Sequence, residues 1–204
     1  MSVETGETAT GTNDRVGRLY RLRVGQYPRM AEAGICSGDD SVELLEGLLV
    51  TKMNKNPPHI ITTELVQLAL VQAVPGGWCV SMQNPVSLFA SDSEPEPDAK
   101  IVRGHPRDYQ GRKPGPEDVA LVVEVADASY LDDLEKRRTY ANAAIPVYWI
   151  LNLNRRRLEV HTDPTGPSPL PLYRTVQTFG PDVEISLWLD GREAARILVG
   201  DLLP

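Results

Sequence analysis

The chain contains little cysteine and no long apolar run. Cys36 and Cys79 are its only cysteines among 204 residues, too few for a disulfide framework or a zinc cluster. No apolar stretch approaches the ~20 residues that a membrane-spanning helix needs, and the N-terminus lacks the basic-then-apolar pattern of a signal peptide. We therefore expect a protein of the reducing cytoplasm with no membrane partner.

An excess of positive charge is also missing. The formal net charge is −7, which argues against a protein that coats nucleic acid non-specifically. This charge is compatible with a phosphodiesterase, because an acidic metal site itself contributes negative charge. Basic residues cluster locally within 103–113 and 155–157, and the plainer interpretation of both clusters is a solvated loop or turn.

The composition that remains is that of one ordinary domain. Apolar residues make up 41% of the chain and charged residues 24%, the balance of a folded globular protein. Residues 1–17 are rich in Thr, Gly, Glu and Asn, so we expect a mobile tail. Residues 18–204 are long enough to bury one substantial core and are predicted to form a single domain.

The spacing of apolar residues predicts an α/β fold. Helical spacing predicts helices over 27–33, 57–74 and 131–144, and the Gly- and Pro-rich segment 104–117 is predicted to be a surface loop. Strands enclosing one crossover helix indicate a mixed central β-sheet flanked by helices. Strands are predicted over 41–53 with a break at Gly47, over 78–82, 85–89, 98–102, 119–125, 147–153 and 157–161, and peripherally after 173.

Glu124 is the informative exception to this pattern. It lies inside the apolar run 119–125, which is typical of a strand buried on both faces. Burying an unpaired carboxylate there would cost several kcal/mol. The group therefore neutralises a metal or a cation, or it lies at the strand end and pairs with a surface arginine.

Asp98 offers a second carboxylate. It follows Pro97, which disfavours regular helix, so Asp98 is expected to open a strand. If this strand neighbours that of Glu124, the two carboxylates converge on one point. Oxygen ligands of this kind favour Mg²⁺, which keeps several waters and accepts phosphate oxygens.

A lysine would complete a site for phosphodiester cleavage, because a cation stabilises charge in the transition state. The residue two after Glu124 on the same strand face is Ala126, so the usual lysine position is empty. Lys136, on the following helix, is the natural replacement. Its structural alternative is an i,i+4 pair with Asp132, worth only ~0.2–0.5 kcal/mol.

A second arrangement is also open. Asp98 and Lys100 have the acid-x-lysine form on one strand face. In that arrangement Glu94 or Glu96, from the adjoining Pro-rich turn, would be the partner acid. Lys100 would otherwise serve as a secondary cation.

From about residue 26 onward, the chain resembles the Uma-two family of restriction endonucleases, within the PD-(D/E)XK nuclease superfamily. No single motif carries this resemblance, but their order along the chain is specific. Asp132, Lys136 and Tyr140 also match, as does His59 at the start of the long predicted helix. The matching stretches are YPRMAEAG (27–34), VELLEG (42–47), PEPD (95–98), LVVEVADAS (121–129) and IPVYWILN (145–152).

The resemblance implies a restriction-endonuclease-like core in which Asp98 and Glu124 bind metal and Lys136 is the displaced catalytic lysine. It also implies that Glu43 adds to the site through water or a second ion. Three further residues have structural alternatives. Ser129 precedes Asp132 at capping-box spacing, Tyr140 follows Lys136 by one turn, and His59 is equally compatible with a packed or exposed histidine.

We therefore expect a metal-dependent endonuclease that hydrolyses nucleic acid, with DNA favoured, and uses Mg²⁺ or Mn²⁺. Asp98, Glu124 and the carbonyl of Val125 would hold the ion, and Lys136 would orient the attacking water. A homodimer would suit cleavage of two strands. The alternatives are a nuclease-fold protein that binds nucleic acid or a protein without cutting, and a small-molecule phosphohydrolase.

Overall fold

The computed structural model describes residues 19–36, 40–52, 55–127 and 130–204, with the backbone alone described for 130–134. The predicted tail, 1–17, lies outside these residues. In the part of the chain that is described, no helix has both the length and the apolar character needed to cross a membrane.

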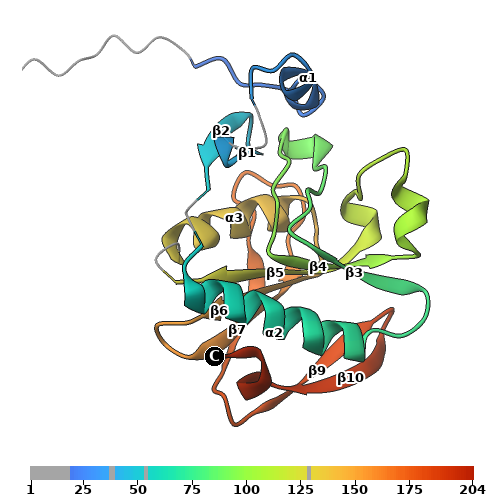
Figure 1. The fold of residues 1–204 in the computed structure, drawn as a ribbon, viewed down its shortest axis with the longest axis vertical. Coiled ribbons are helices and arrows are strands. Elements are labelled where there is room, and N and C mark those ends of the chain that lie inside the picture. The colour runs from blue at the N-terminus through green and yellow to red at the C-terminus, as the bar shows by residue number, and fades with distance from the viewer. Residues whose placement is uncertain (1–18, 37–39, 53–54, 128–129) are drawn as a thin grey trace, which may run out of the picture.

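Six strands form the central sheet, in the order β3-β4-β5-β6-β7-β8 (Figure 1). Strands β5 and β6 are parallel and are joined by the crossover helix α3 (Tyr130–Asn142), whereas the other neighbouring pairs are antiparallel. The predicted mixed sheet is confirmed. Its strands are β3 (Trp78–Met82), β4 (Ala99–Arg103), β5 (Val119–Ala126), β6 (Val147–Asn152), β7 (Arg157–Pro164) and β8 (Tyr173–Phe179).

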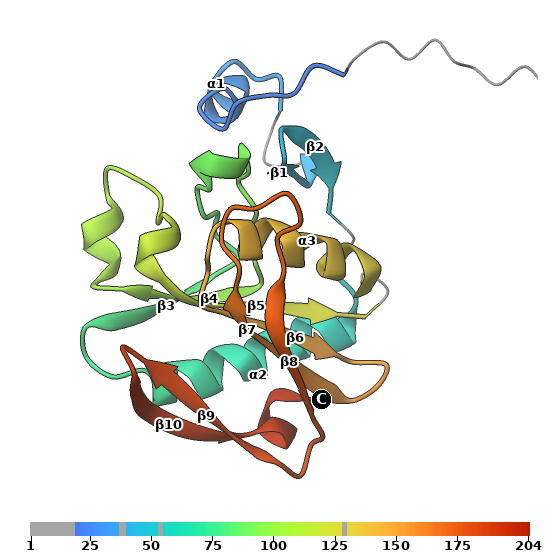
Figure 2. The same cartoon turned by 180° about the vertical axis from the view of Figure 1, so that it is seen from behind.

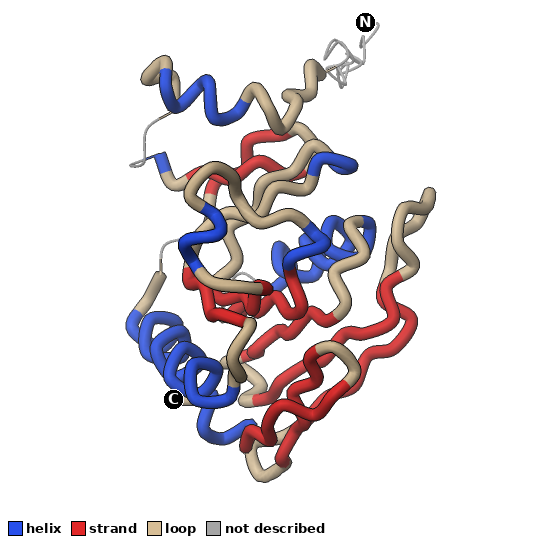
Figure 3. Tube along the Cα trace, turned by 90° about the vertical axis from the view of Figure 1, so that its right-hand side faces the viewer, coloured by secondary structure: helices blue, strands red, loops and turns tan. Residues whose placement is uncertain are grey.

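Helices cover both faces of this sheet. Helix α2 (Pro57–Ala73) lies on one face and α3 on the other (Figure 1 and Figure 3). The hairpin of β9 (Glu184–Leu189) and β10 (Arg192–Leu198) packs on the α2 face (Figure 2). Two apolar cores result, one on each side of the sheet.

Strand alternation in β5 places Glu124 toward α3. Leu121, Val123 and Val125 belong to the α2-side core, whereas Val122 and Ala126 belong to the α3-side core. Because successive side chains point to opposite faces, the carboxylate of Glu124 projects with the second set.

The N-terminal elements lie beyond α3 (Figure 1). Helix α1 (Tyr27–Glu32) is followed by the hairpin of β1 (Val42–Leu45) and β2 (Leu48–Thr51). The turn residues of this hairpin, Glu46 and Gly47, have φ of 48° and 78°, as a type I′ turn requires. A Cβ on Gly47 would lie 2.7 Å from that of Arg21, so glycine is required there.

One predicted strand is wrong. Over 85–89 the backbone makes only a bridge between Leu88 and Ser93, and a 3₁₀ helix (Phe89–Ser91) follows. The amide groups of this segment do not form the regular hydrogen bonds of a strand ladder. For example, the N–H of Ser87 donates to the carbonyl of Pro114. The predicted loop 104–117 contains the 3₁₀ turn Pro106–Tyr109 and the start of another, Pro116–Asp118. A further 3₁₀ turn, Val199–Leu202, follows β10.

His161 is a buried histidine whose ring nitrogens make no hydrogen bond within the described residues. Tyr148 and Tyr173 pack against its ring, and the carboxylate of Glu159 lies 3.8 Å from Nε2. Burial, reinforced by Arg137 on α3 and opposed by Glu159, lowers the pKa of His161 to about 4. The folded protein therefore holds this imidazole neutral.

Acid is expected to destabilise the fold through this residue. In the unfolded state His161 is protonated below pH ~6.5, whereas in the folded state it is protonated only below about pH 4. Stability should thus fall by roughly 3 kcal/mol across this window, at about 1.4 kcal/mol per pKa unit. Urea unfolding at a series of pH values should show that His161→Phe flattens this slope, while His105→Asn, at an exposed histidine, retains it. Equal slopes in both variants would contradict the assignment.

Candidate active site

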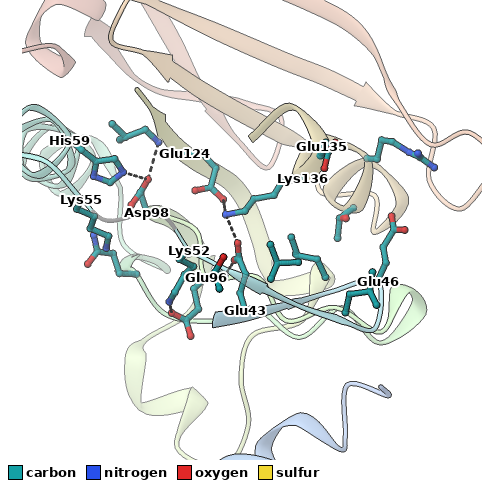
Figure 4. A pocket seen from close by; sticks show the side chains of 18 of the residues that line it. Glu43, Glu46, Lys52, Lys55, His59, Glu96, Asp98, Glu124, Glu135 and Lys136 are labelled. Atoms are coloured by element: carbon teal, nitrogen blue, oxygen red, sulfur yellow. Dashed lines mark hydrogen bonds and ion pairs between the residues drawn. The ribbon is translucent and has the colours of Figure 1, made fainter. Parts of the chain in front are cut away.

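The predicted site residues surround a cavity of about 430 Å³ (Figure 4). Its walls come from the β1–β2 hairpin, the start of α2, the adjoining ends of β4 and β5, and α3. Those residues are far apart in sequence and meet because β4 and β5 are neighbours. The cavity is lined by Glu43, His59, Asp98, Glu124, Val125 and Lys136, among others.

Glu124 and Lys136 form the centre of the site. The Lys136 amine lies 3.3 Å from Glu124 Oε1 and 2.8 Å from Glu43 Oε1. Tyr140, one helical turn further along α3, donates its hydroxyl to Glu124 Oε1 at 3.0 Å. The side chains of Glu43, Glu124 and Lys136 are 3%, 4% and 11% exposed, so this network is almost fully withdrawn from water.

Asp98 lies directly before β4 and is held by two donors. Its Oδ2 accepts the backbone N–H of Val125 at 2.9 Å and lies 3.2 Å from Nε2 of His59. Burial by itself would raise the pKa of Asp98. The hydrogen bond and charge of His59, together with the Val125 bond, outweigh burial and lower the pKa of Asp98 below its ordinary value.

The register brings the two acids together. Ala99 pairs with Val123 across the β4–β5 ladder, so Asp98 lies across from Glu124. In an antiparallel ladder the N–H and C=O of one residue point to the same side. The carbonyl of Val125 therefore faces the same side as its N–H, which is the side of Asp98.

Helix α2 presents His59 to this acid. Asn56 caps the helix by accepting the His59 backbone N–H at 3.1 Å, which fixes the first turn. Thr63 Oγ1 lies 3.4 Å from the other ring nitrogen of His59. The imidazole is thus oriented between α2 and Asp98 and lines the cavity.

Lys100 lies elsewhere. It is completely buried, and its amine donates to the carbonyl of Asn84. Burial lowers the pKa of Lys100 to about 8, although Glu96 and Glu124 act in the opposite direction. Lys100 is not part of the cavity lining, and this position favours a structural role over the secondary cation considered above. Glu94 pairs with Lys113, and Glu96 pairs with Lys52.

Other predicted residues fall outside the site or the described side chains. Ser129 lies outside the described residues, and the side chain of Asp132 is not described. Residues of the basic cluster 103–113 are engaged in ion pairs, with Arg103 bonded to Asp190 and Arg112 bonded to Asp118. None of that cluster lines the cavity.

Sequence reasoning missed several cavity residues. Lys55, Arg138 and the apolar side chains of the hairpin also line it. A lysine before a helix or an arginine within one gives no signal that separates it from an ordinary surface cation. The hairpin alternation was a usable signal, because Glu43 shares its strand face with Leu45.

The donor set fits a hard divalent ion that keeps most of its water. Across the described side chains, no three His, Cys, Asp or Glu residues gather closely enough to form a complete metal site. Two buried carboxylates and a backbone carbonyl offer only oxygen ligands. Mg²⁺ is commonly bound through one or two carboxylates, with water and substrate phosphate completing its shell.

Tyr140→Phe tests whether the orientation of Glu124 matters. For the metal-dependent cleavage expected from the sequence, Tyr140 would be an outer partner of a metal ligand, so losing the hydroxyl should lower kcat about tenfold, with a stability cost of about 1 kcal/mol. Tyr173→Phe is the matched control, because that buried hydroxyl donates to the Ile145 carbonyl at 2.9 Å. It should show a similar loss in thermal unfolding and unchanged cleavage. Parallel loss of activity in both variants would point to a general effect on the fold.

Comparisons with known proteins identify a similar fold and a family. A crystal structure of a "putative nuclease belonging to DUF820" from Anabaena variabilis superposes with a TM-score of 0.67, at 12% identity, over 89% of this chain and 97% of that chain. A comparison with curated proteins found no match. The model of the Uma2 (Uma-two) family, described as "Putative restriction endonuclease", matches residues 24–195. This chain belongs to the Uma2 family.

Proposed function

We propose that the protein is a metal-dependent nuclease that hydrolyses phosphodiester bonds in DNA with Mg²⁺ or Mn²⁺. One observation carries the proposal. The amine of Lys136 lies 3.3 Å from Glu124, on the strand beside Asp98, and all three residues line one cavity. Membership of a family described as "Putative restriction endonuclease" supports the same reaction class.

Each residue has a distinct role in this proposal. Asp98, Glu124 and the carbonyl of Val125 would hold the ion. When bound, Mg²⁺ would polarise a phosphoryl oxygen and stabilise charge on the leaving oxygen. Lys136 would orient the attacking water and oppose the negative charge that builds up on the phosphate.

The lysine comes from α3 because β5 cannot supply it. Ala126, two residues after Glu124, is completely buried in the α3-side core. The amine therefore reaches Glu124 from the helix that packs on that face. Tyr140 on the same helix fixes Glu124, and His59 on α2 fixes Asp98.

Cleavage of plasmid and oligonucleotide DNA tests the proposal. We expect hydrolysis with Mg²⁺ or Mn²⁺ and none with EDTA, and we expect no release of phosphate from mononucleotides. Glu124→Ala should be inactive, and Lys136→Ala should cleave about a hundredfold more slowly. Equal activity in all three proteins would identify a contaminating enzyme and remove the support for a nuclease.

A further inference from the structure

The face of the β1–β2 hairpin that carries Glu43 also carries an apolar surface. Glu43 pairs with Val50, and Leu45 pairs with Leu48. Side chains alternate along each strand, so these four residues share one face. All four line the cavity, and Glu43 reaches across it to Lys136 (Figure 4).

This apolar surface is accessible from within the cavity. Leu45 and Leu48 are half-buried and Val50 is 37% exposed. They line the same cavity as Asp98 and Glu124, so one cavity offers carboxylates and an aliphatic wall together. Such a combination suits a ligand that has an anionic part and an apolar part. A nucleotide unit, with its phosphate and its base, has this chemistry.

Access to the acids is narrow. The side chains of Asp98, Glu124 and Lys136 are only 10%, 4% and 11% exposed. The cavity volume of about 430 Å³ lies in the ~300–1,000 Å³ range of small-ligand clefts. A continuous duplex keeps its bases stacked and presents only base edges in its grooves. Its phosphate cannot reach the acids while the base lies against the hairpin.

An unpaired strand meets both requirements, because its bases are free to leave the stack. Cations also line the cavity near the acids. Lys52 and Lys55 lie on the Asp98 side, whereas Glu46 lies at the opposite end (Figure 4). Lys52 is paired with Glu96, so favourable charge for a phosphate that flanks the scissile bond would come from Lys55.

We propose that Leu45, Leu48 and Val50 form a nucleoside subsite, and that the substrate is an unpaired strand of nucleic acid. This inference rests on the proposed function. It assigns the scissile phosphate to the acids and the neighbouring base to the hairpin wall.

One oligonucleotide sequence in three forms tests the substrate class. The forms are a single strand, a continuous duplex, and a duplex with a central unpaired loop. With Mg²⁺ we expect the single strand and the loop to be cut at least tenfold faster than the duplex. Cleavage of the continuous duplex as fast as the single strand and the loop would overturn the inference while leaving the nuclease proposal intact.

Val50→Ser and Leu49→Ser test the subsite. Leu49 is 38% exposed, almost the same as Val50, but it lies on the opposite face of β2 and outside the cavity lining. Val50→Ser should raise KM for the single strand about fivefold with kcat unchanged, and Leu49→Ser should leave both unchanged. A strand of abasic units should bind wild type about fivefold more weakly than the normal strand does. It should bind wild type and Val50→Ser equally well.

Equal effects of the two serine variants would overturn the subsite, as would an abasic strand that binds as well as the normal one. Failure of wild type to cut any form with any divalent ion would overturn the proposed function itself, whether or not phosphate is released from mononucleotides. That outcome is distinct, because the others all retain strand cleavage.

Discussion

Replacing Glu124 by glutamine is expected to abolish cleavage while leaving the protein folded. Glutamine preserves the size of the side chain and its contacts with Tyr140 and Lys136, but it removes the negative charge that a divalent ion requires. Loss of metal assistance is worth several kcal/mol, which is a fall in kcat on the order of a thousandfold or more. Single-turnover cleavage at saturating enzyme measures this loss.

Glu135→Gln is the matched control for that experiment. Glu135 is exposed and lines the same cavity next to Lys136 in sequence, but it makes none of the contacts that join the two acids and the lysine. The Glu135→Gln substitution removes one negative charge from the cavity, as Glu124→Gln does, but it should change kcat by less than about threefold. Equal losses in the two variants would mean that cavity charge, not the position of Glu124, governs activity.

Replacing Lys136 by methionine is expected to lower both stability and activity. The amine is paired with both Glu43 and Glu124, two carboxylates that are 3% and 4% exposed. Removing one partner of a buried ion pair leaves uncompensated charge and costs about 3 kcal/mol or more. Cleavage should fall about a hundredfold, because the charge that opposes the developing anion is lost.

A double variant separates these two effects. Glu43→Gln together with Lys136→Met removes one buried negative charge along with the cation, so most of the lost stability should return. Activity should stay low, because the amine remains absent. Urea unfolding and single-turnover cleavage of the four proteins in this cycle give both quantities. Recovery of activity in the double variant would show that Lys136 only stabilises the fold.

Much of the site was predictable because its residues violate local rules. Glu124 interrupts an apolar strand, and a charge in that position demands a partner. The sequence predicted the strands that hold Asp98 and Glu124 but left their adjacency as a condition, which the β4–β5 ladder meets. Lys136 was harder to assign, since from the residues alone an i,i+4 pair with Asp132 was the better explanation. Its contact with Glu124 depends on how α3 packs on the sheet, which apolar spacing does not specify.

The strand expected over 85–89 failed for a related reason. Apolar content predicts burial, and Val86 and Leu88 are indeed buried, but it does not specify the partner of each backbone amide. Those amides bond to Pro95 and Ser93, which sequence spacing does not place nearby. The aliphatic wall of the hairpin was likewise overlooked, because half-exposed Leu45 and Leu48 resemble ordinary strand residues until Glu43 is seen to face the cavity.

A crystal grown with Mn²⁺ would test the account most directly. Anomalous density at coordination distance from a carboxylate oxygen of both Asp98 and Glu124, absent from Glu124→Gln crystals and present in Glu135→Gln crystals, is the predicted result. Ordered wild-type crystals with no manganese between those two carboxylates, or with the same manganese peak in Glu124→Gln, would contradict it.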